Sequence, residues 1–459
     1  MWKHTYADCL SYIDSYWDRV IHTRGAHLAE KWLSVFVPGL QRSVRHRFIE
    51  VPRAYVTPND RKFAHIFYWD TFFIFRGLMG TKRQWIMKEM VENFIHLFKI
   101  YGLIPNLNAP MGLGRTQPPF FSSMILDVYR HDKRSRFSLM GEDRNKWFGR
   151  AMKIAKEEYA LVWIDEENLY HHRVAGQILA RYGDRDVGYA HSSELESGWD
   201  FTSRFYNRCN EFLPIDLNCY LYKYELDFAE ASQLLGRQKE EMRWTALAAE
   251  RKQSINELMW NEEDGFFFDY GWHYERKSVF LSLAGFVPLW AGLADANQAQ
   301  KMVKKLSAFE TPFGLAITAK ESLASPIDLS KIQRRFHPAI KEIIDPKQWD
   351  YPNIWLPLEY LTVIGLLRYG FQEEAKRIMT SSVKAHADLF RKYGTFFEKI
   401  NGENGEPSET FVYENQTGFG WTNAVFYRYV QILDHLEEQK NLYREPKAEV
   451  PPFDLVIMH

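Results

Sequence analysis

Apolar residues recur at helical spacing along most of this 459-residue chain, which predicts a body built from α-helices. The predicted helices span residues 82–100, 145–163, 216–235, 237–260, 356–368, 371–390 and 421–438. A helical lead-in precedes them within residues 1–50, where Ile13, Trp17 and Val20 lie on one helical face. Strands and helices do not alternate along the sequence, so the pattern favours an all-α fold over a mixed sheet.

Several of the predicted helices end in the same way, at a glycine that precedes a short extended segment. Tyr101-Gly102 is followed by Leu-Ile-Pro-Asn106, in which the proline disfavours a helical conformation of the residue before it. Tyr393-Gly394 is followed by Thr-Phe-Phe-Glu398. A recurring unit of helix, turn and extended segment indicates stacked helical hairpins.

The composition excludes two classes of partner. A net charge of −1, with no local run of Lys and Arg, lacks the basic surface that nucleic-acid binding requires. No apolar run approaches the length of a membrane span, and the first residues lack the apolar core of a signal peptide. The three cysteines form no CxxC pair, which fits a reducing compartment. We therefore expect a soluble cytoplasmic protein that binds neither nucleic acid nor membrane, and the oligomeric state stays open.

One acidic residue lies in a segment that favours catalysis, Glu-Ser-Gly-Trp-Asp200-Phe-Thr-Ser-Arg-Phe. Gly198 lets the backbone come close, while Trp199 and Phe201 shield Asp200 from water. An Asp in such a setting can hold a proton near neutral pH, as the acid of a glycosidase must. Most acidic residues are solvated surface charges or helix caps, and this alternative stays open on the chemistry alone.

A glycosidase acid needs a partner carboxylate, and Glu398 offers one. It lies in Gly394-Thr-Phe-Phe-Glu398-Lys-Ile, an extended segment that is again flanked by aromatic residues. If Asp200 is not the acid, Glu196 is the nearest alternative in the sequence. The pattern predicts an acid and base pair drawn from two distant segments of the chain.

Several segments resemble those of the trehalases, glycoside hydrolases of the inverting (α/α)6-barrel clan. Besides Glu-Ser-Gly-Trp-Asp200, they are Phe67-Tyr-Trp-Asp70, Gly102-Leu-Ile-Pro-Asn106, Arg115-Thr-Gln-Pro-Pro119, Leu213-Pro-Ile-Asp-Leu-Asn218, Gln348-Trp-Asp-Tyr-Pro-Asn353 and Gly418-Phe-Gly-Trp-Thr-Asn423. The matching segments run in family order from about residue 67 to residue 423. The resemblance therefore covers most of the chain.

The resemblance implies an all-α (α/α)6 barrel, a toroid of helical hairpins, over residues 51–440. Residues 1–50 would pack on it as a helical lead-in, and residues 441–459 would form a tail. It further implies inverting hydrolysis of trehalose or a similar small α-glucoside, with Asp200 as general acid and Glu398 as general base. Inversion requires room for a water, so their carboxyl groups are expected about 6.5–9.5 Å apart.

The resemblance also implies a set of substrate-binding residues and no metal or cofactor. The set is Arg61, Trp69, Asp70, Asn106, Arg115, Gln117, Gly198, Gln348, Trp349 and Trp355. In the family, a Trp-Asp at the position of Asp70 holds the cleaved glucose, while a plain helix cap is the alternative for this residue. Trp349 and Trp355 would stack on the sugar or wall the cleft.

Three departures from the trehalase pattern concern the leaving group. Pro58-Asn-Asp-Arg61 stands where the family has Gly-Gly-Arg, and Tyr189-Ala-His-Ser-Ser-Glu194 replaces an Arg-Pro-Glu segment that binds the second glucose. Thr417 stands where a glutamate is expected. Lost polar contacts change which partner of the glucose is accepted. The alternatives are a glucosylglycerate or mannosylglycerate hydrolase of the same clan, and a toroid that binds a sugar without cleaving it.

Two segments, residues 323–347 and residues 401–409, are rich in turn-forming and charged residues. Each is interpreted either as a lid over the site or as a plain surface loop.

Overall fold

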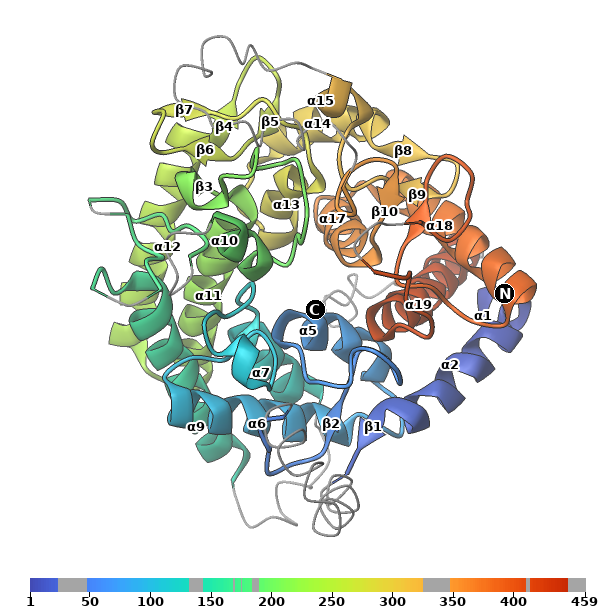
Figure 1. Ribbon diagram of the computed structural model, residues 1–459, viewed down its shortest axis with the longest axis horizontal. Coiled ribbons are helices and arrows are strands. Elements are labelled where there is room, and N and C mark those ends of the chain that lie inside the picture. Colours follow the sequence, from blue (N-terminus) through green and yellow to red (C-terminus); the bar gives the residue numbers. More distant parts are fainter. Residues whose placement is uncertain are drawn as a thin grey trace. The chain divides into compact units, whose positions relative to one another are not determined.

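The computed structural model describes residues 1–23, 48–131, 143–167, 170–174, 176–183, 190–324, 347–409 and 413–444. Residues 24–47 of the predicted lead-in, 445–459 of the predicted tail and 325–346 of the predicted lid lie outside these residues. The division of the chain into lead-in, barrel and tail therefore stays a prediction. Helices dominate the described residues and the strands are two residues long, which confirms the all-α prediction (Figure 1). No described helix combines the length and apolar composition that a membrane span requires.

The chain forms two compact units. One comprises Met1–Asp14, Trp199–Asp216 and the chain from Glu257 onward, and the other comprises Ser15–Gly198 and Leu217–Asn256. Asp200 and Glu398 lie in the first of these units, which we call the catalytic unit. The other is called the companion unit.

The companion unit is built mainly from helices that pack side by side. The elements along this part of the chain are α2 (Ala7–Val20), β1 (Ile21–His22), β2 (Tyr55–Val56), α5 (Tyr68–Leu78), α6 (Trp85–Tyr101), η1 (Pro110–Gly112), α7 (Phe121–His131), α9 (Arg144–Glu158), the π-helix η2 (Tyr159–Ile164), α10 (Ala190–Glu196), α11 (Ile215–Leu234) and α12 (Gln238–Met259). Helices α5, α6 and α7 pack against one another, and α9 packs on α6 and α7 (Figure 1). Strands β1 and β2 pair antiparallel, with Ile21 opposite Val56.

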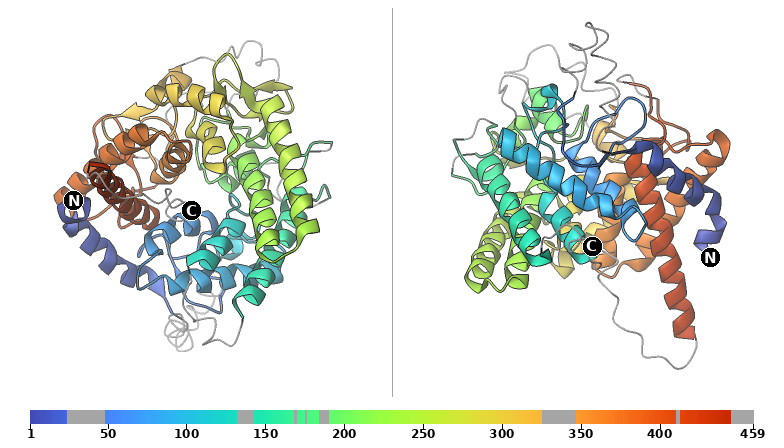
Figure 2. Two further views of the ribbon diagram at one scale, coloured as in Figure 1. Left: turned by 180° about the vertical axis from the view of Figure 1, so that it is seen from behind. Right: turned by 90° about the horizontal axis from the view of Figure 1, so that it is seen from below.

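The catalytic unit combines helices with short antiparallel pairs. Its elements are α1 (Trp2–Thr5), η3 (Cys209–Glu211), β3 (Phe212–Leu213), β4 (Trp260–Asn261), β5 (Phe266–Phe267), β6 (Tyr270–Gly271), β7 (Arg276–Lys277), η4 (Leu283–Phe286), α13 (Val287–Ala291), α14 (Ala296–Lys304), η5 (Lys305–Ala308), β8 (Glu310–Thr311), β9 (Gly314–Leu315), α15 (Lys320–Ala324), β10 (Asn353–Ile354), α17 (Leu356–Arg368), α18 (Gln372–Tyr393), β11 (Ile400–Asn401) and α19 (Gly420–Arg444). Helix α17 packs on α13, α18 and α19, as Figures 1 and 2 show from three directions. Strands β10 and β11 pair with Ile354 opposite Ile400, which fixes the chain just after Glu398.

The helices with a clear apolar face lie where the sequence places them. Helix α17 has the predicted bounds, and α6 ends at Tyr101 with Gly102 in the left-handed conformation at a φ of 73°. The prediction of one helix over 145–163 is incomplete, because the chain changes from α-helix to π-helix after Glu158. Helix α5 was not predicted, since all of its residues are buried and its sequence has no polar face to give it a period.

A buried carboxyl group links three helices of the companion unit. The Tyr68 and Tyr224 hydroxyls lie 3.0 and 2.9 Å from the two oxygens of Glu158, and 2.8 Å from each other. These three contacts need three protons, and the two hydroxyls supply only two. A protonated Glu158 supplies the third. Burial raises the pKa of Glu158 to about 7, in agreement with this proton count.

We expect Glu158→Gln to stabilise the protein at pH 8 but not at pH 4. Between pH 4.5, the ordinary value, and about 7, the unfolded chain releases the proton while the folded chain keeps it. The free energy of unfolding therefore falls as pH rises through this window, by about 3 kcal/mol. A glutamine avoids the loss because it does not titrate.

Thermal unfolding followed by circular dichroism at pH 4, 6 and 8 measures this difference. Glu157→Gln is the matched control, because Glu157 is on the same helix with a side chain that is 42% exposed. Equal gains in the two variants, or a gain that does not depend on pH, would contradict a neutral Glu158.

Candidate active site

The segment that carries Asp200 follows helix α10 through a strained turn. Gly198 has a φ of 75°, and a Cβ there would lie 2.6 Å from a ring carbon of Trp69. Glycine is therefore required both by the backbone and by the close packing of Trp69. Phe201, next to the half-buried Asp200, also has a positive φ, of 64°. Such strain in a non-glycine residue persists only where surrounding contacts impose it, and it is frequent at active sites.

Contacts from the Gln348–Asn353 segment hold this turn. The buried Asp350 carboxylate accepts hydrogen bonds from the Ser203 backbone N–H at 2.9 Å and from the Ser203 hydroxyl at 2.6 Å. Burial raises the pKa of Asp350, although these donors act in the opposite direction. The Trp349 backbone N–H donates to the Phe201 carbonyl at 3.2 Å. The two segments are thus fixed to each other just after Asp200.

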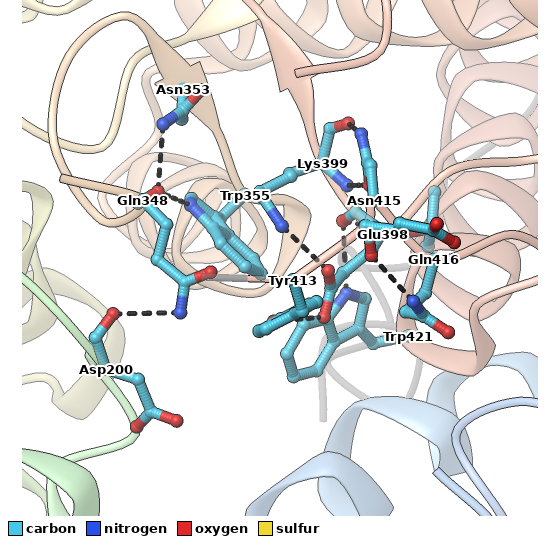
Figure 3. Close-up of polar contacts among 12 residues, drawn as sticks. Asp200, Gln348, Asn353, Trp355, Glu398, Lys399, Tyr413, Asn415, Gln416 and Trp421 are labelled. Atoms are coloured by element: carbon cyan, nitrogen blue, oxygen red, sulfur yellow. Dashed lines mark hydrogen bonds and ion pairs between the residues drawn. The ribbon is translucent and has the colours of Figure 1, made fainter. Parts of the chain in front are cut away.

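Gln348 contacts the backbone of Asp200 directly. Its side-chain Nε2 donates to the Asp200 backbone carbonyl at 2.9 Å, and the Gln348 backbone carbonyl accepts from Trp355 Nε1 at 2.8 Å. Figure 3 shows the Asp200 carboxyl group directed away from this amide. Gln348 is only 3% exposed, yet its Oε1 has no hydrogen-bond partner among the described residues. An unsatisfied buried acceptor is costly, which marks this atom as a candidate contact for a bound ligand.

Two of the predicted substrate-binding residues stack on each other. The rings of Trp349 and Trp355 lie 3.9 Å apart between centroids, with an angle of 6° between their planes. Both side chains are buried, and Trp421 packs edge-on against both rings. The three rings form a rigid aromatic wall next to Glu398, because Trp421 Nε1 also donates to the Glu398 carbonyl at 3.4 Å.

The Glu398 carboxylate is buried and held at both oxygens (Figure 3). Lys399 Nζ lies 2.8 Å from Oε2, and the Tyr413 hydroxyl donates to Oε1 at 2.9 Å. The Glu398 backbone N–H donates to the Gln416 carbonyl at 2.8 Å. An adjacent ammonium favours the ionised form of a carboxylate, and a general base must be ionised to accept a proton.

The companion unit brings five other predicted residues together. Trp69 packs on Gly198, and its backbone N–H donates to Gln117 Oε1 at 3.1 Å. The Asn106 backbone N–H donates to the Arg115 carbonyl at 3.0 Å, and Asn106 Nδ2 lies 3.4 Å from the Leu195 carbonyl, on the helix that leads into the Asp200 turn.

Asp70 and Arg61 have different surroundings. Asp70 is buried in the first turn of α5, three residues beyond the N-cap residue Phe67, so it does not occupy the cap position itself. The Arg61 side chain is exposed, and its backbone N–H donates to Asn59 Oδ1 at 3.2 Å. No contact in the described part of the chain joins the Arg61 side chain to the other predicted residues.

Glu196, the alternative acid, is fully engaged as a structural group. Its Oε2 accepts from His172 Nε2 at 2.8 Å and from the Gly183 N–H at 2.7 Å, while Oε1 accepts from the Thr116 N–H at 3.0 Å. These three contacts bind segments that all precede the Asp200 turn in the sequence. A carboxylate used in this way is poorly placed to donate a proton to a substrate, which favours Asp200 as the acid.

Sequence reasoning missed the residues that hold the Glu398 carboxylate and the turn that carries Asp200. Lys399 stands next to Glu398 in the sequence, but this adjacency is a weak signal, because successive side chains of an extended segment point to opposite faces. Tyr413 and Asp350 gave none, because each reaches its partner only through the tertiary fold. No group of three or more His, Cys, Asp and Glu residues in the described ranges is placed to hold a metal ion.

Comparison with known proteins identifies the fold and the family. The chain is similar to the neutral trehalase of Saccharomyces cerevisiae, with 24% identity, a TM-score of 0.74 and 96% of both chains covered. It is also similar to a GH63 mannosylglycerate hydrolase of Thermus thermophilus, solved with glucose, at 17% identity and a TM-score of 0.57 over 86% of this chain and 99% of that one. These likenesses show the (α/α)6-barrel fold that the sequence predicted. The model of the trehalase family matches residues 7–196 and 183–436. Because this match extends over most of the sequence, the chain belongs to the trehalase family of glycoside hydrolases.

Proposed function

We propose that this protein hydrolyses trehalose, or a similar small α-glucoside, with inversion at the anomeric carbon. Asp200 is the general acid and Glu398 is the general base. Asp200 gives its proton to the glycosidic oxygen as the bond from that oxygen to the anomeric carbon breaks. Water attacks the same carbon from the opposite face and gives its proton to Glu398. The glucose keeps the hydroxyl group of the water, and the leaving group keeps the proton from Asp200. The proton on Glu398 then passes to solvent, and Asp200 takes up another for the next turnover.

The observation that carries this proposal is a continuous series of contacts between the two carboxyl-bearing residues. Gln348 binds the Asp200 carbonyl, and the Gln348 carbonyl accepts from Trp355 Nε1. The Trp355 ring lies 4.8 Å from Lys399 Nζ, which binds Glu398. Precise placement of acid and base is worth several orders of magnitude in rate, so a rigid connection of this kind supports a catalytic pair. Both carboxylates are present, which disfavours a toroid that only binds sugar.

The surroundings of the pair support a sugar substrate. Gln348 Oε1, which has no hydrogen-bond partner among the described residues, can accept a hydrogen bond from a sugar hydroxyl. We assign a substrate-binding role to five further residues, Trp69, Asp70, Asn106, Arg115 and Gln117. Arg61 is assigned the same role on the family resemblance alone, because its side chain is exposed. The three cysteines, Cys9, Cys209 and Cys219, are buried and form no CxxC pair, which supports a cytoplasmic location.

A glycerate-linked substrate is the second candidate. The family's Arg-Pro-Glu segment for the second glucose is replaced here by Tyr189-Ala-His-Ser-Ser-Glu194. The side chains of residues 189–192 are not among those that the structure describes. One of the similar structures is a mannosylglycerate hydrolase. A pocket that lacks the polar partners of a second glucose discriminates against it, because buried polar groups are left unpaired.

The proposed mechanism predicts that β-glucose is released first from an α-glucoside. The protein is incubated with trehalose, kojibiose, glucosylglycerol and glucosylglycerate in turn, and proton NMR records the products within the first minutes, before mutarotation. The hydrolysed compound identifies the leaving group, and the first anomer identifies the mechanism. From trehalose, inversion releases one β-glucose and one α-glucose, because the leaving glucose keeps its own configuration. Initial products that contain α-glucose alone would mean a covalent intermediate, which the assignment of Glu398 as base does not permit.

A further inference from the structure

Lys399 carries a buried charge beside the candidate base. Its side chain has no exposed surface, and its Nζ lies 2.8 Å from Glu398 Oε2. The rings of Trp355 and Tyr413 lie 4.8 and 4.7 Å from the same ammonium group. Lysine is rarely buried completely unless its charge is paired, because removing an ammonium from water is costly. The carboxylate and the faces of the two rings together provide that compensation.

The contact between Glu398 and Lys399 does not follow from their adjacency in the sequence. Successive side chains of an extended strand point to opposite faces. Here the chain bends at Glu398, between the bridge from Phe397 to Thr417 and strand β11, which begins at Ile400. Because of this bend, the two neighbouring side chains reach the same side.

A second residue fixes the backbone of Lys399. Asn415 Nδ2 donates to the Lys399 carbonyl at 2.7 Å, and Asn415 Oδ1 accepts from the Lys399 N–H at 3.4 Å. The Asn415 segment also delivers Tyr413, whose hydroxyl binds the other oxygen of Glu398. Two segments of the chain therefore converge on one carboxylate (Figure 3).

We propose that Lys399 and Tyr413 are positioning residues, which fix the orientation of the Glu398 carboxylate and compensate its buried charge. This inference rests on the proposed role of Glu398 as general base. A carboxylate has about four lone-pair positions, and the two contacts occupy two of them. The remaining positions can accept the proton of the attacking water. The ammonium compensates the charge of the carboxylate, and the hydroxyl prevents the carboxylate from rotating.

The test compares pH–rate profiles of Lys399→Met and wild type, with the α-glucoside that the protein hydrolyses. The titratable groups that contact the Glu398 carboxylate in the described residues are Lys399 and Tyr413. Without the ammonium, the buried carboxylate has no compensating charge, so the acidic limb of kcat/KM is expected to move to higher pH. Activity at pH 5 should fall at least tenfold, and it should recover partly at pH 8.

Two further variants separate the charge from the hydrogen bonds. Lys399→Gln keeps a donor toward Oε2 without the charge, so it should move the acidic limb as Met does, and it serves if the Met variant does not fold. Lys399→Arg restores the charge and should return the limb toward its wild-type position. Tyr413→Phe should lower kcat with a smaller shift of the limb, because it removes one neutral hydrogen bond.

The chain supplies a matched control on its surface. Lys392 Nζ lies 2.6 Å from Glu406 Oε1, and the Tyr393 hydroxyl donates to Glu406 Oε2 at 2.8 Å. The same three residue types thus meet in the same way, but exposed to solvent. Lys392→Met and Tyr393→Phe are expected to leave both limbs of the profile unchanged.

The possible outcomes distinguish this inference from the function on which it rests. A folded Lys399→Met or Lys399→Gln variant with an unmoved acidic limb overturns the role of Lys399, while an unchanged kcat in Tyr413→Phe overturns that of Tyr413. Both results are interpretable only if Glu398→Gln is inactive. If Glu398→Gln keeps its activity, the assignment of the base is wrong and the positioning role falls with it.

Discussion

The Asp200→Asn and Glu398→Gln variants are expected to lose turnover by about 10²–10⁴-fold each, with the fold intact. Each substitution removes one of two proton transfers while it keeps the size and shape of the side chain. Asp200 is half-buried on a loop, so its amide should be tolerated. At Glu398 the amide oxygen can still accept from Tyr413 or Lys399, but the amide cannot take a proton from water.

Kinetics paired with circular dichroism measure this effect. Glu403→Gln is the matched control, because Glu403 lies on the exposed turn just after β11 and binds only surface partners, Lys320 and Tyr351. It should keep wild-type turnover, since exposed ion pairs contribute little. More than about a tenth of wild-type turnover in either variant would remove that residue from its role, because general acid or base catalysis contributes far more than tenfold.

The sequence was sufficient to predict the elements with local signals. Helix α17 was placed by its apolar residues, and the end of α6 by the glycine at 102, because both signals arise within a few residues of the chain. Helix α5 was missed for the opposite reason. Its fully buried surface comes from neighbouring helices, and nothing in its own polar pattern reports them.

In the candidate site, too, features with a local sequence signal were predicted, while contacts made only by the tertiary fold were not. Gly198 was predicted from the tight turn it occupies, and its φ of 75° agrees with such a turn, but the packing of Trp69 against it was not predicted. Sequence reasoning did not predict three contacts: Glu196 with His172, Asp350 with Ser203, and Tyr413 with Glu398. Each contact joins residues that the tertiary fold brings together from different segments of the chain. The pairing of Asp200 with Glu398 itself came from a family resemblance, and their spacing stays a prediction. The suggestion that residues 401–409 act as a lid likewise stays a prediction.

A buried ionic cluster stabilises the segment that carries Asp200. Arg204, four residues further on, is fully buried and donates to both oxygens of Asp216 at 2.8 Å. It also donates to the two oxygens of Asp269, at 2.8 and 2.6 Å. Its guanidinium group lies 4.6 Å from the ring of Trp199. One side chain thus ties the Asp200 segment to the start of α11 and to the residue before β6.

We expect Arg204→Met to destabilise the protein by about 3–5 kcal/mol or more, because it leaves two carboxylates buried without a cation. Arg204→Lys should be intermediate, since a single ammonium cannot reproduce the planar fork that serves two carboxylates at once. The triple variant Arg204→Met, Asp216→Asn, Asp269→Asn should recover most of the loss, because it removes the uncompensated charges together with the cation. Urea unfolding, followed by tryptophan fluorescence and circular dichroism, gives the three free energies of unfolding. If the single Met variant unfolds within about 1 kcal/mol of wild type, or if the triple variant is no more stable than it, desolvated charge is not what makes Arg204 necessary, and packing against Trp199 becomes the better explanation.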